Sequence, residues 1–342
     1  MRVGLTRAVS MGAGFSKSMP VWRQDWLIAG FGLLVLALSG LMLSGTARAD
    51  AALTAVDWLN RAAAAAKQQN YSGVYVYHHG EHVEVLRVLH RIDAKGEQEK
   101  VEVLDGAPRQ FLRINNDVYC HLPDGKHVRL ERNAPRRFFP ALLPAQPASL
   151  LAYYDAKLGG AERVAGRLSQ VVLLEPRDSY RHAYTLWIDK QSGVPLKSRI
   201  VNSNGSAVSM FVFSEIQIGK APDVQLFLND MAGKSILKAS LDQPASVNWS
   251  VTPPPGFKQV QEAVRVLPGK QMPVTHLVFS DGLSVLSMFV EPVNPGMQRM
   301  VGLSAEGAIG IYTREVDGYT VTTLGEVPGT ALIETGNSVK RK

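Results

Sequence analysis

Apolar and polar residues alternate most regularly between residues 180 and 219, and this pattern predicts three antiparallel strands. Two turn signals divide the segment, Lys190-Gln191-Ser192-Gly193 and Asn204-Gly205. An Asn-Gly pair is typical of a type I′ turn, in which both central residues have a positive φ angle. Because Lys197 and Arg199 share one face of the middle strand, we expect that face to contact water and the opposite face to be buried.

Short alternating runs continue on both sides of this segment and are separated by turn residues. They predict strands over residues 74–77, 83–89, 99–104, 110–114, 118–122, 127–131, 164–168 and 171–174 before it, and over 258–266, 274–280, 284–290, 307–314 and 319–324 after it. So many strands with tight turns predict an α+β fold that is mainly antiparallel β, with a large bent, partly closed N-terminal sheet and a smaller C-terminal α+β domain.

Apolar residues spaced by three and four predict helices over residues 51–69 and 149–158, and a short helix is expected after Pro328. Gly159-Gly160 is expected to end the second helix. The apolar stripe of the first helix is predicted to contain Leu53, Val56, Leu59, Ala63 and Ala66.

The first 49 residues have the layout of a secretory signal peptide. Four basic residues precede an apolar run at residues 27–43, and Ala47-Arg48-Ala49 forms a cleavage site before Asp50. The alternative is an uncleaved anchor, since the run is close to the length that spans a bilayer. Met19 is an alternative start. We expect cleavage after Ala49 and export of the remaining chain.

The changes in pattern divide the chain into five parts. They are a signal peptide at 1–49, an N-terminal β domain at 50–220, a linker with short structure at 221–243, a C-terminal domain at 244–336, and a disordered tail at 337–342.

The net charge of +7 comes largely from the leader, which contains five of the 37 Lys and Arg residues and one of the 30 Asp and Glu residues. The remaining chain carries only +3, and no nucleic-acid motif accompanies this charge, so we expect no nucleic-acid partner. The single cysteine, Cys120, excludes an intramolecular disulfide and is expected to be a small buried side chain.

Catalytic motifs are nearly absent. Ser235 and Lys238 have the spacing of a penicillin-binding-protein nucleophile but lack its partner motifs, and Gly233-Lys234-Ser235 lacks the first glycine of a phosphate-binding loop because residue 228 is leucine. We therefore expect a binding protein without enzymatic activity or a cofactor.

Three histidines, His78, His79 and His82, lie near one predicted hairpin tip. Imidazole is the commonest metal ligand. However, adjacent strand residues point to opposite faces and no carboxylate completes a ligand set, so a polar hairpin end is the preferred interpretation and no metal site is predicted.

A proline-containing segment, residues 132–144, is the candidate ligand site. Its arginines could pair with phosphates and its phenylalanines could contact acyl chains. The alternative is a solvated basic loop whose phenylalanines fill the core. The candidate residues are Arg132, Arg136, Arg137, Phe138 and Phe139.

Three motifs, in this order, resemble the RseB/MucB family of envelope-stress regulators. The first is Asn70-Tyr71-Ser72-Gly73. The second combines Tyr184-Thr185-Leu186-Trp187-Ile188-Asp189 with the Ser-Gly-x-Pro-Leu-Lys-Ser, Asn-Gly and Phe-x-Phe patterns that follow it, and the third is residues 276–284. The resemblance implies a lipoprotein-carrier-like (LolA/LppX-like) unclosed barrel as the N-terminal domain.

The resemblance further implies a periplasmic negative regulator of a sigma factor. Such a protein binds the periplasmic segment of a membrane-spanning anti-sigma factor (RseA/MucA-like), protects it from site-one proteolysis, and releases it on sensing lipopolysaccharide or a lipoprotein. The resemblance points to His276, Phe279, Ser280 and Asp281 as partner-binding residues.

Two other classes stay open: a periplasmic lipid or lipoprotein carrier of the outer-membrane sorting type, which would need only residues 50–220, and a structural envelope protein. The sequence is compatible with a monomer and with a homodimer.

Overall fold

The structure, a computed structural model, describes residues 53–115, 117–121, 127–130, 139–228, 236–238, 249–265, 272–293 and 301–342. The predicted signal peptide lies outside these residues. Among the helices that the structure describes, none is long and apolar enough to cross a membrane.

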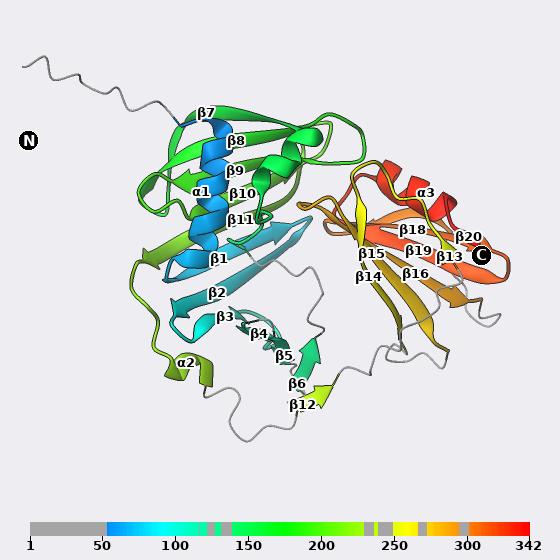
Figure 1. The fold of residues 1–342 in the computed structure, drawn as a ribbon, viewed down its shortest axis with the longest axis horizontal. Helices are drawn as coiled ribbons and strands as arrows, with labels where there is room; N and C mark the ends of the chain where they lie inside the picture. The colour runs from blue at the N-terminus through cyan, green and yellow to red at the C-terminus, as the bar shows by residue number, and fades with distance from the viewer. Residues whose placement is uncertain are drawn as a thin grey trace, which may run out of the picture. The chain divides into compact units, whose positions relative to one another are not determined.

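The larger sheet has twelve strands and is open, because its two outermost strands, β12 and β7, do not pair with each other (Figure 1). Their order is β12-β6-β5-β4-β3-β2-β1-β11-β10-β9-β8-β7, and every pair is antiparallel except the parallel pair of β12 and β6. The strands are β1 (Tyr71–His79), β2 (His82–Asp93), β3 (Gly96–Val103), β4 (Gln110–Ile114), β5 (Asp117–His121), β6 (His127–Leu130), β7 (Tyr154–Val164), β8 (Arg167–Pro176), β9 (Ala183–Asp189), β10 (Pro195–Val201), β11 (Ala207–Ile218) and β12 (Ile236–Lys238). The large antiparallel sheet predicted from the alternation is confirmed.

Strands β1 and β11, far apart in sequence, join the two halves of this sheet. Their register places Tyr75 opposite Phe213, Tyr77 opposite Phe211 and His79 opposite Ser209. Directly opposed residues project to the same face, so this pairing lines one face of the sheet with aromatic rings. We call this the inner face.

The Asn70-Tyr71-Ser72-Gly73 motif stabilises the start of β1. The side-chain oxygen of Asn70 accepts a hydrogen bond from the Ile92 amide at 2.8 Å, and its carbonyl accepts one from the Gly219 amide at 2.8 Å. Gly73 is needed for close approach of the strands, because a Cβ there would lie 2.5 Å from the Glu215 carbonyl oxygen.

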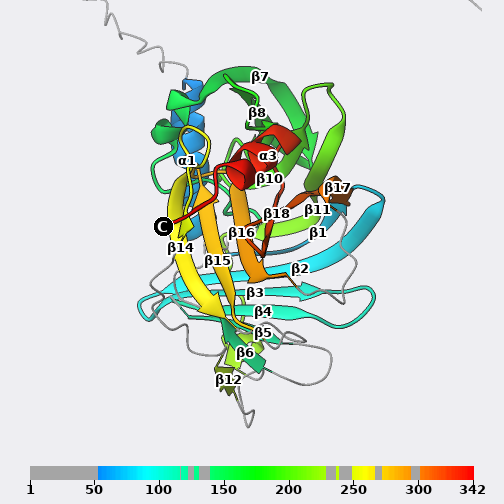
Figure 2. The same cartoon turned by 90° about the vertical axis from the view of Figure 1, so that its right-hand side faces the viewer.

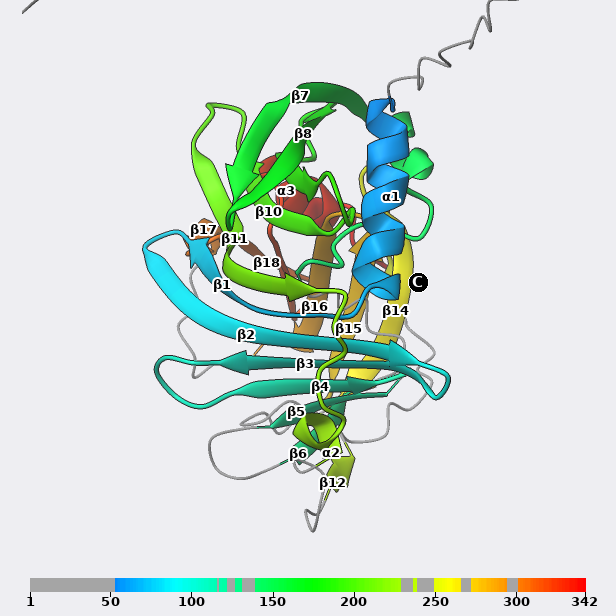
Figure 3. The same ribbon diagram turned by 90° about the vertical axis from the view of Figure 1, so that its left-hand side faces the viewer.

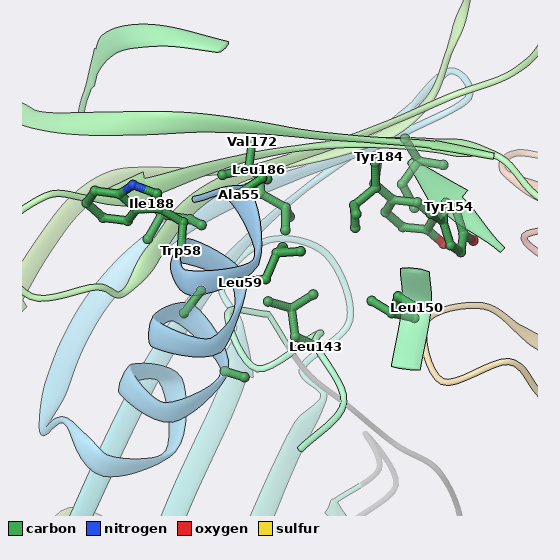
Figure 4. Close-up of a cluster of buried hydrophobic side chains, with 14 residues drawn as sticks. Ala55, Trp58, Leu59, Leu143, Leu150, Tyr154, Val172, Tyr184, Leu186 and Ile188 are labelled. Atoms are coloured by element: carbon green, nitrogen blue, oxygen red, sulfur yellow. The ribbon is translucent and has the colours of Figure 1, made fainter. Parts of the chain in front are cut away.

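Helix α1 (Ala55–Gln68) covers the inner face near β7, β8 and β9 (Figure 3). It begins with a capping box, in which Thr54 and Asp57 each bind the other's backbone amide. Trp58 and Leu59 pack against Leu186 and Ile188 of β9 (Figure 4). Alanine on the same stripe lets the helix approach the sheet closely.

The predicted stripe of α1 is only partly correct. Leu59, Ala63 and Ala66 are buried, but Leu53 precedes the helix and is exposed. Trp58, which the stripe omitted, is buried because the helix lies across a curved sheet that covers a wider arc than a single row of residues.

The smaller sheet has six described strands in the order β14-β15-β16-β19-β18-β17, all antiparallel. Figure 2 shows its first three strands, β14, β15 and β16, side by side. They are β14 (Lys258–Arg265), β15 (Val274–Ser280), β16 (Val285–Pro292), β17 (Gly302–Glu306), β18 (Ile309–Val316) and β19 (Tyr319–Gly325). Helix α3 (Gly329–Asn337) packs on β18 and β19, where Leu332 is fully buried with Phe279 and Leu286. The predicted helix after Pro328 is confirmed, whereas β17 was not predicted.

The segment predicted as a linker contains a short helix, α2 (Gln225–Leu228), and the edge strand β12. Phe227 of α2 is fully buried against Leu89 and Leu112, so part of the outer face of the larger sheet is also covered.

The helix predicted over residues 149–158 is wrong. A 3₁₀-helix, η1 (Pro147–Ala152), is followed at once by strand β7, and Gly159-Gly160 forms a bulge inside that strand. Pairing with β8 outweighs the local helical spacing, and Leu158 at the end of the predicted helix is exposed.

Two turns also differ from expectation. Residues 164–168 are not a strand, because Ala165 and Gly166 both have positive φ and form the two-residue turn between β7 and β8. At Asn204-Gly205 only Gly205 has a positive φ, and the Asn202 amide donates to the Ser206 carbonyl. That loop is therefore a longer connection and not a type I′ turn.

The tail predicted to be disordered is ordered. Val339 is 3% exposed, and β20 (Lys340–Arg341) pairs with β13 (Trp249–Ser250). The pairing buries Trp249, whose ring meets that of Tyr319 edge-on at 4.9 Å. The chain end therefore closes the core of the smaller sheet.

Val339→Ala is expected to lower the free energy of unfolding by about 1–2 kcal/mol, because two buried methyl groups are lost and a cavity is left. Urea unfolding followed by tryptophan fluorescence measures this change. Lys342→Ala, which removes an exposed side chain, is the control. Equal stability of both variants would show that the tail does not pack in solution.

Candidate functional site

Of the candidate ligand residues, Arg132, Arg136, Arg137 and Phe138 lie outside the described residues. Phe139 is described and is 1% exposed. It joins the core of the inner face, which is what the alternative interpretation of this segment expects for its phenylalanines. Its assignment to a ligand site stays a prediction.

Phe139 lies among three rings of the inner face. Its ring centroid is 5.3 Å from Tyr75, 5.4 Å from Phe211 and 5.2 Å from Phe213, and Tyr77 stacks on Phe211 at 4.2 Å. Burial is the main cause that raises the pKa of the Tyr75 and Tyr77 hydroxyls. Tyr75, Phe139 and Phe213 are at most 2% exposed, so the rings form an apolar core in which only Tyr77 and Phe211 are half-buried.

The candidate partner residues divide between the two faces of the smaller sheet. Phe279 is 1% exposed and belongs to the core beneath α3. His276 projects to the opposite face, where its ring stacks on Phe289 at 4.2 Å and its Nε2 lies 3.3 Å from the Ser287 hydroxyl. A direct partner contact through the buried ring of Phe279 would require the core to open, whereas His276 is only half-buried.

Ser280 and Asp281 begin the turn between β15 and β16. Asp281 Oδ1 accepts hydrogen bonds from the amides of Leu283, at 2.8 Å, and Ser284, at 2.7 Å. The Ser280 hydroxyl donates to the Ser284 carbonyl at 2.9 Å. The Ser-Asp-Gly-Leu-Ser sequence therefore builds a self-bonded turn from its own short polar side chains.

The second oxygen of Asp281 contacts the loop before β9. Arg181 Nε donates to Asp281 Oδ2 at 2.8 Å, and both side chains are at most 1% exposed. The Tyr154 hydroxyl donates to the same oxygen at 3.3 Å. One further contact is between the Tyr184 and Ser284 hydroxyls, 3.1 Å apart. The turn is thus bound to three side chains of the larger sheet and its loops, and we call these contacts the junction.

Arg181 is almost completely enclosed. Its guanidinium also binds Asp178 and the carbonyl of Pro255, and it lies 4.3 Å from the Tyr153 ring centroid. Gly256 has a positive φ, and a Cβ there would lie 2.5 Å from Arg181 and from Tyr153, so only glycine fits. The paired and hydrogen-bonded arginine meets the conditions under which a buried charge is tolerated.

The sequence indicated Asp281 but neither Arg181, which binds Asp281, nor the contact of Tyr184 with Ser284. Both residues lie in the segment that predicts strands best, and Tyr184 begins one of the family motifs, but no local pattern indicates what either side chain binds. Their partners lie 100 residues away in the chain, so only the tertiary structure reveals the contact.

Within the described residues, no three His, Cys, Asp or Glu side chains are placed to hold a metal ion. His79 and His82 approach each other with ring centroids 5.4 Å apart, and burial, followed by its histidine neighbours, lowers the pKa of His79. Cys120 is buried, as predicted.

Asp281→Ala is expected to destabilise the protein by about 3 kcal/mol, because it leaves the Arg181 charge buried with fewer partners and removes the acceptor of the turn. Thermal or urea unfolding measures the loss.

Asp155→Ala is the matched control, since it breaks an exposed Asp155–Arg177 pair and should change little. Asp281→Asn keeps an oxygen that accepts from the turn amides but loses the negative charge. It therefore separates the hydrogen bonds of the turn from the ion pair with Arg181. If Asp281→Ala is as stable as Asp155→Ala, the junction does not exist in solution.

Two protein-family models match this chain. The MucB/RseB N-terminal domain matches residues 54–238, and the MucB/RseB C-terminal domain matches residues 243–340. The two matches contain the larger and the smaller sheet respectively.

Named relatives agree with these matches. The sigma factor AlgU regulatory protein MucB of Pseudomonas aeruginosa is 32% identical over 306 residues, which cover 87% of this chain and 94% of the relative. The sigma-E factor regulatory protein RseB of Escherichia coli (strain K12) is 25% identical over 86% of this chain and 92% of its own length.

Among solved structures, the complex of Pseudomonas aeruginosa MucA and MucB contains a chain similar to this one, with a TM-score of 0.67 and 29% identity over 84% of this chain and 99% of that chain. A crystal structure of MucB in complex with MucA(peri) gives a TM-score of 0.65. The two matched domains, in the order in which the sequence motifs occur, show that this chain belongs to the MucB/RseB family of sigma factor regulatory proteins.

Proposed function

We propose that this protein binds the periplasmic segment of a membrane-spanning anti-sigma factor and thereby restrains a sigma factor. The observation that carries the proposal is the similarity to MucB structures determined with MucA, which extends over 99% of the MucB chain and includes both sheets. A carrier would need only the larger sheet, so a complete second domain favours a regulator.

We assign partner recognition to the C-terminal domain and, within residues 276–281, to the face that bears His276. This face lacks the cover of α3 and presents the stacked rings of His276 and Phe289. Stacked aromatic rings at a half-buried position provide rigid contact area, which is a common feature of residues that dominate binding energy. Phe279 and Asp281 would act indirectly, by holding the strand and the turn in place.

We further propose that a lipid releases the partner. The aromatic inner face would accept acyl chains, and Arg132, Arg136 and Arg137 would bind phosphate groups. If lipid and partner favour different states of the protein, each weakens the binding of the other by the same factor. Lipopolysaccharide and a lipoprotein both offer this chemistry.

In this proposal the protein is a regulator without catalytic activity of its own. It acts in the periplasm after cleavage of residues 1–49, with boundaries near residues 220 and 243 between its domains. Shielding a polypeptide from a protease requires only binding, which fits the absence of recognisable catalytic motifs in the sequence.

Calorimetry of residues 50–342 with a soluble anti-sigma periplasmic segment tests partner binding. His276→Ala should weaken binding by about tenfold, because it removes one stacked contact from the proposed surface. Arg199→Ala, an exposed change on the larger sheet, is the control and should bind normally. Unchanged binding by His276→Ala would move the partner surface elsewhere, and no binding by the wild type would end the regulator proposal.

The lipid response is tested by repeating the titration with lipopolysaccharide fragments. Wild-type protein should bind the partner more weakly when the fragment is present, and the double variant Arg136→Glu, Arg137→Glu should lose most of this effect because its phosphate contacts become repulsive. The double variant should still bind the partner. An intact lipid response would remove the basic segment from the site, and lipid binding without partner binding would favour a carrier.

A further inference from the structure

A cavity of about 330 Å³ lies beside the junction, and it shares Phe211 with the aromatic cluster of the inner face. Side chains of both sheets and of the loops that connect their strands form its apolar wall. The main members are Leu142, Ile200, Phe211, Leu283, Val285 and Leu324. A volume in this range, with apolar walls and few polar groups, is typical of small-molecule sites.

Among the described residues that line this cavity, Glu326 alone carries a carboxylate. It lies between β19 and α3, and its Oε1 is buried without a hydrogen-bond partner. Ser209 on β11 lies close to this carboxylate, and its buried hydroxyl also has no partner within hydrogen-bond geometry. Two unsatisfied polar atoms in one place are costly, and such atoms call for a ligand or for another compensating contact.

Desolvation raises the pKa of Glu326 to about 7, and the nearby Ser209 hydroxyl offsets this rise only in part. Glu326 forms no ion pair with any described residue. The carboxylate can therefore be stabilised either by a proton or by a cation that enters the cavity.

The groups that face Glu326 supply no such cation. Strands β1 and β9 present the phenols of Tyr77 and Tyr184, and proximity to Glu326 contributes, after burial, to raising the pKa of both. On the turn between β15 and β16, Asp281 is already paired with Arg181. His79 of β1, which lies opposite Ser209 of β11, stacks on Tyr77, and burial lowers its pKa.

We infer that this cavity binds a small alkylammonium compound, with its ammonium group on the Glu326 carboxylate and its hydrocarbon chain against Ile200, Phe211 and Leu283. A carboxylate and an ammonium form a charge-assisted hydrogen bond that is strong when water is excluded. The Tyr184 hydroxyl oxygen in the cavity wall and the Ser209 hydroxyl oxygen near Glu326 can accept hydrogen bonds from the remaining ammonium N–H groups. The hydrocarbon chain of the ligand then packs on the apolar cavity wall, which water solvates poorly.

The pH dependence of binding follows from the two charges. An alkylammonium keeps its proton, like a lysine side chain, to about pH 10. Glu326 must be ionised to pair with it, and its raised pKa means that ionisation is incomplete below about 7. Affinity should therefore increase from pH 5.5 to pH 8.5 and then level off.

Hexylamine is the probe, titrated calorimetrically into residues 50–342 at both pH values. We expect saturable binding at pH 8.5 that is weakened by about tenfold at pH 5.5 and by about tenfold or more in Glu326→Gln. Hexan-1-ol has the same chain without the charge and should bind weakly, and hexanoate should not bind. Glu306→Gln changes an exposed carboxylate and should bind like the wild type.

The pH dependence of the free energy of unfolding shows whether Glu326→Gln is folded. A raised pKa means that the wild type is stabilised below the ordinary glutamate pKa, and that this stability is lost as the pH rises through about 7. Glu326→Gln should lack this loss and be at least as stable as the wild type at pH 8.5, so weaker binding by the variant would not reflect unfolding.

The inference is overturned if hexylamine does not bind, if hexan-1-ol binds as tightly, or if Glu326→Gln binds hexylamine like the wild type. It is independent of the proposed function, because the titration contains no anti-sigma segment and no lipid.

Discussion

The pairing of β1 with β11 is the constraint on which the rest of the larger sheet depends. It connects the meander that follows α1 to the meander that ends at Ile218, and it is the only contact that makes one sheet from the two described meanders. Its register sets which residues face inward, because a slip of one residue would turn Tyr75 and Tyr77 to the outer face. The bulge after Val74 and the close approach at Gly73 fix this register. Both the aromatic cluster around Phe139 and the cavity beside Glu326 are built on this face.

The junction and the inner face contain buried ionisable groups that differ in how well their surroundings stabilise them. The Arg181–Asp281 pair is buried and fully bonded, so it holds the turn firmly and resists partial separation. The Glu326 carboxyl, a short distance along the same surface, is buried without such compensation. A regulator needs alternative states that differ by only a few kcal/mol. A well-paired Arg181–Asp281 contact close to the poorly compensated Glu326 carboxyl is one physical means of keeping the free-energy difference between such states small.

The sequence predicted most of the strands because alternation and turn residues are local signals. Residues 180–219 gave the correct meander, and Leu196, Ser198 and Ile200 are buried on one face of β10 as the pattern requires. It failed where a distant partner decides the structure. Residues 154–158 follow a helical spacing but pair with β8, and Val339 looks like part of a charged tail but fills a core. The same reason explains the site: Asp281 lies in a visible motif, whereas Arg181 and Glu326 become notable only through contacts across the fold.

The edge of strand β7 affects how readily two molecules of this protein associate. It is an outermost strand of the larger sheet, so within the described part of the chain one of its edges has no strand beside it. The bulge at Gly159-Gly160 breaks the regular spacing of its backbone groups, and Lys157, Glu162 and Arg163 place charges along it. A strand of a second molecule would therefore meet an edge that is irregular and charged. Both features disfavour edge-to-edge association of two molecules through β7.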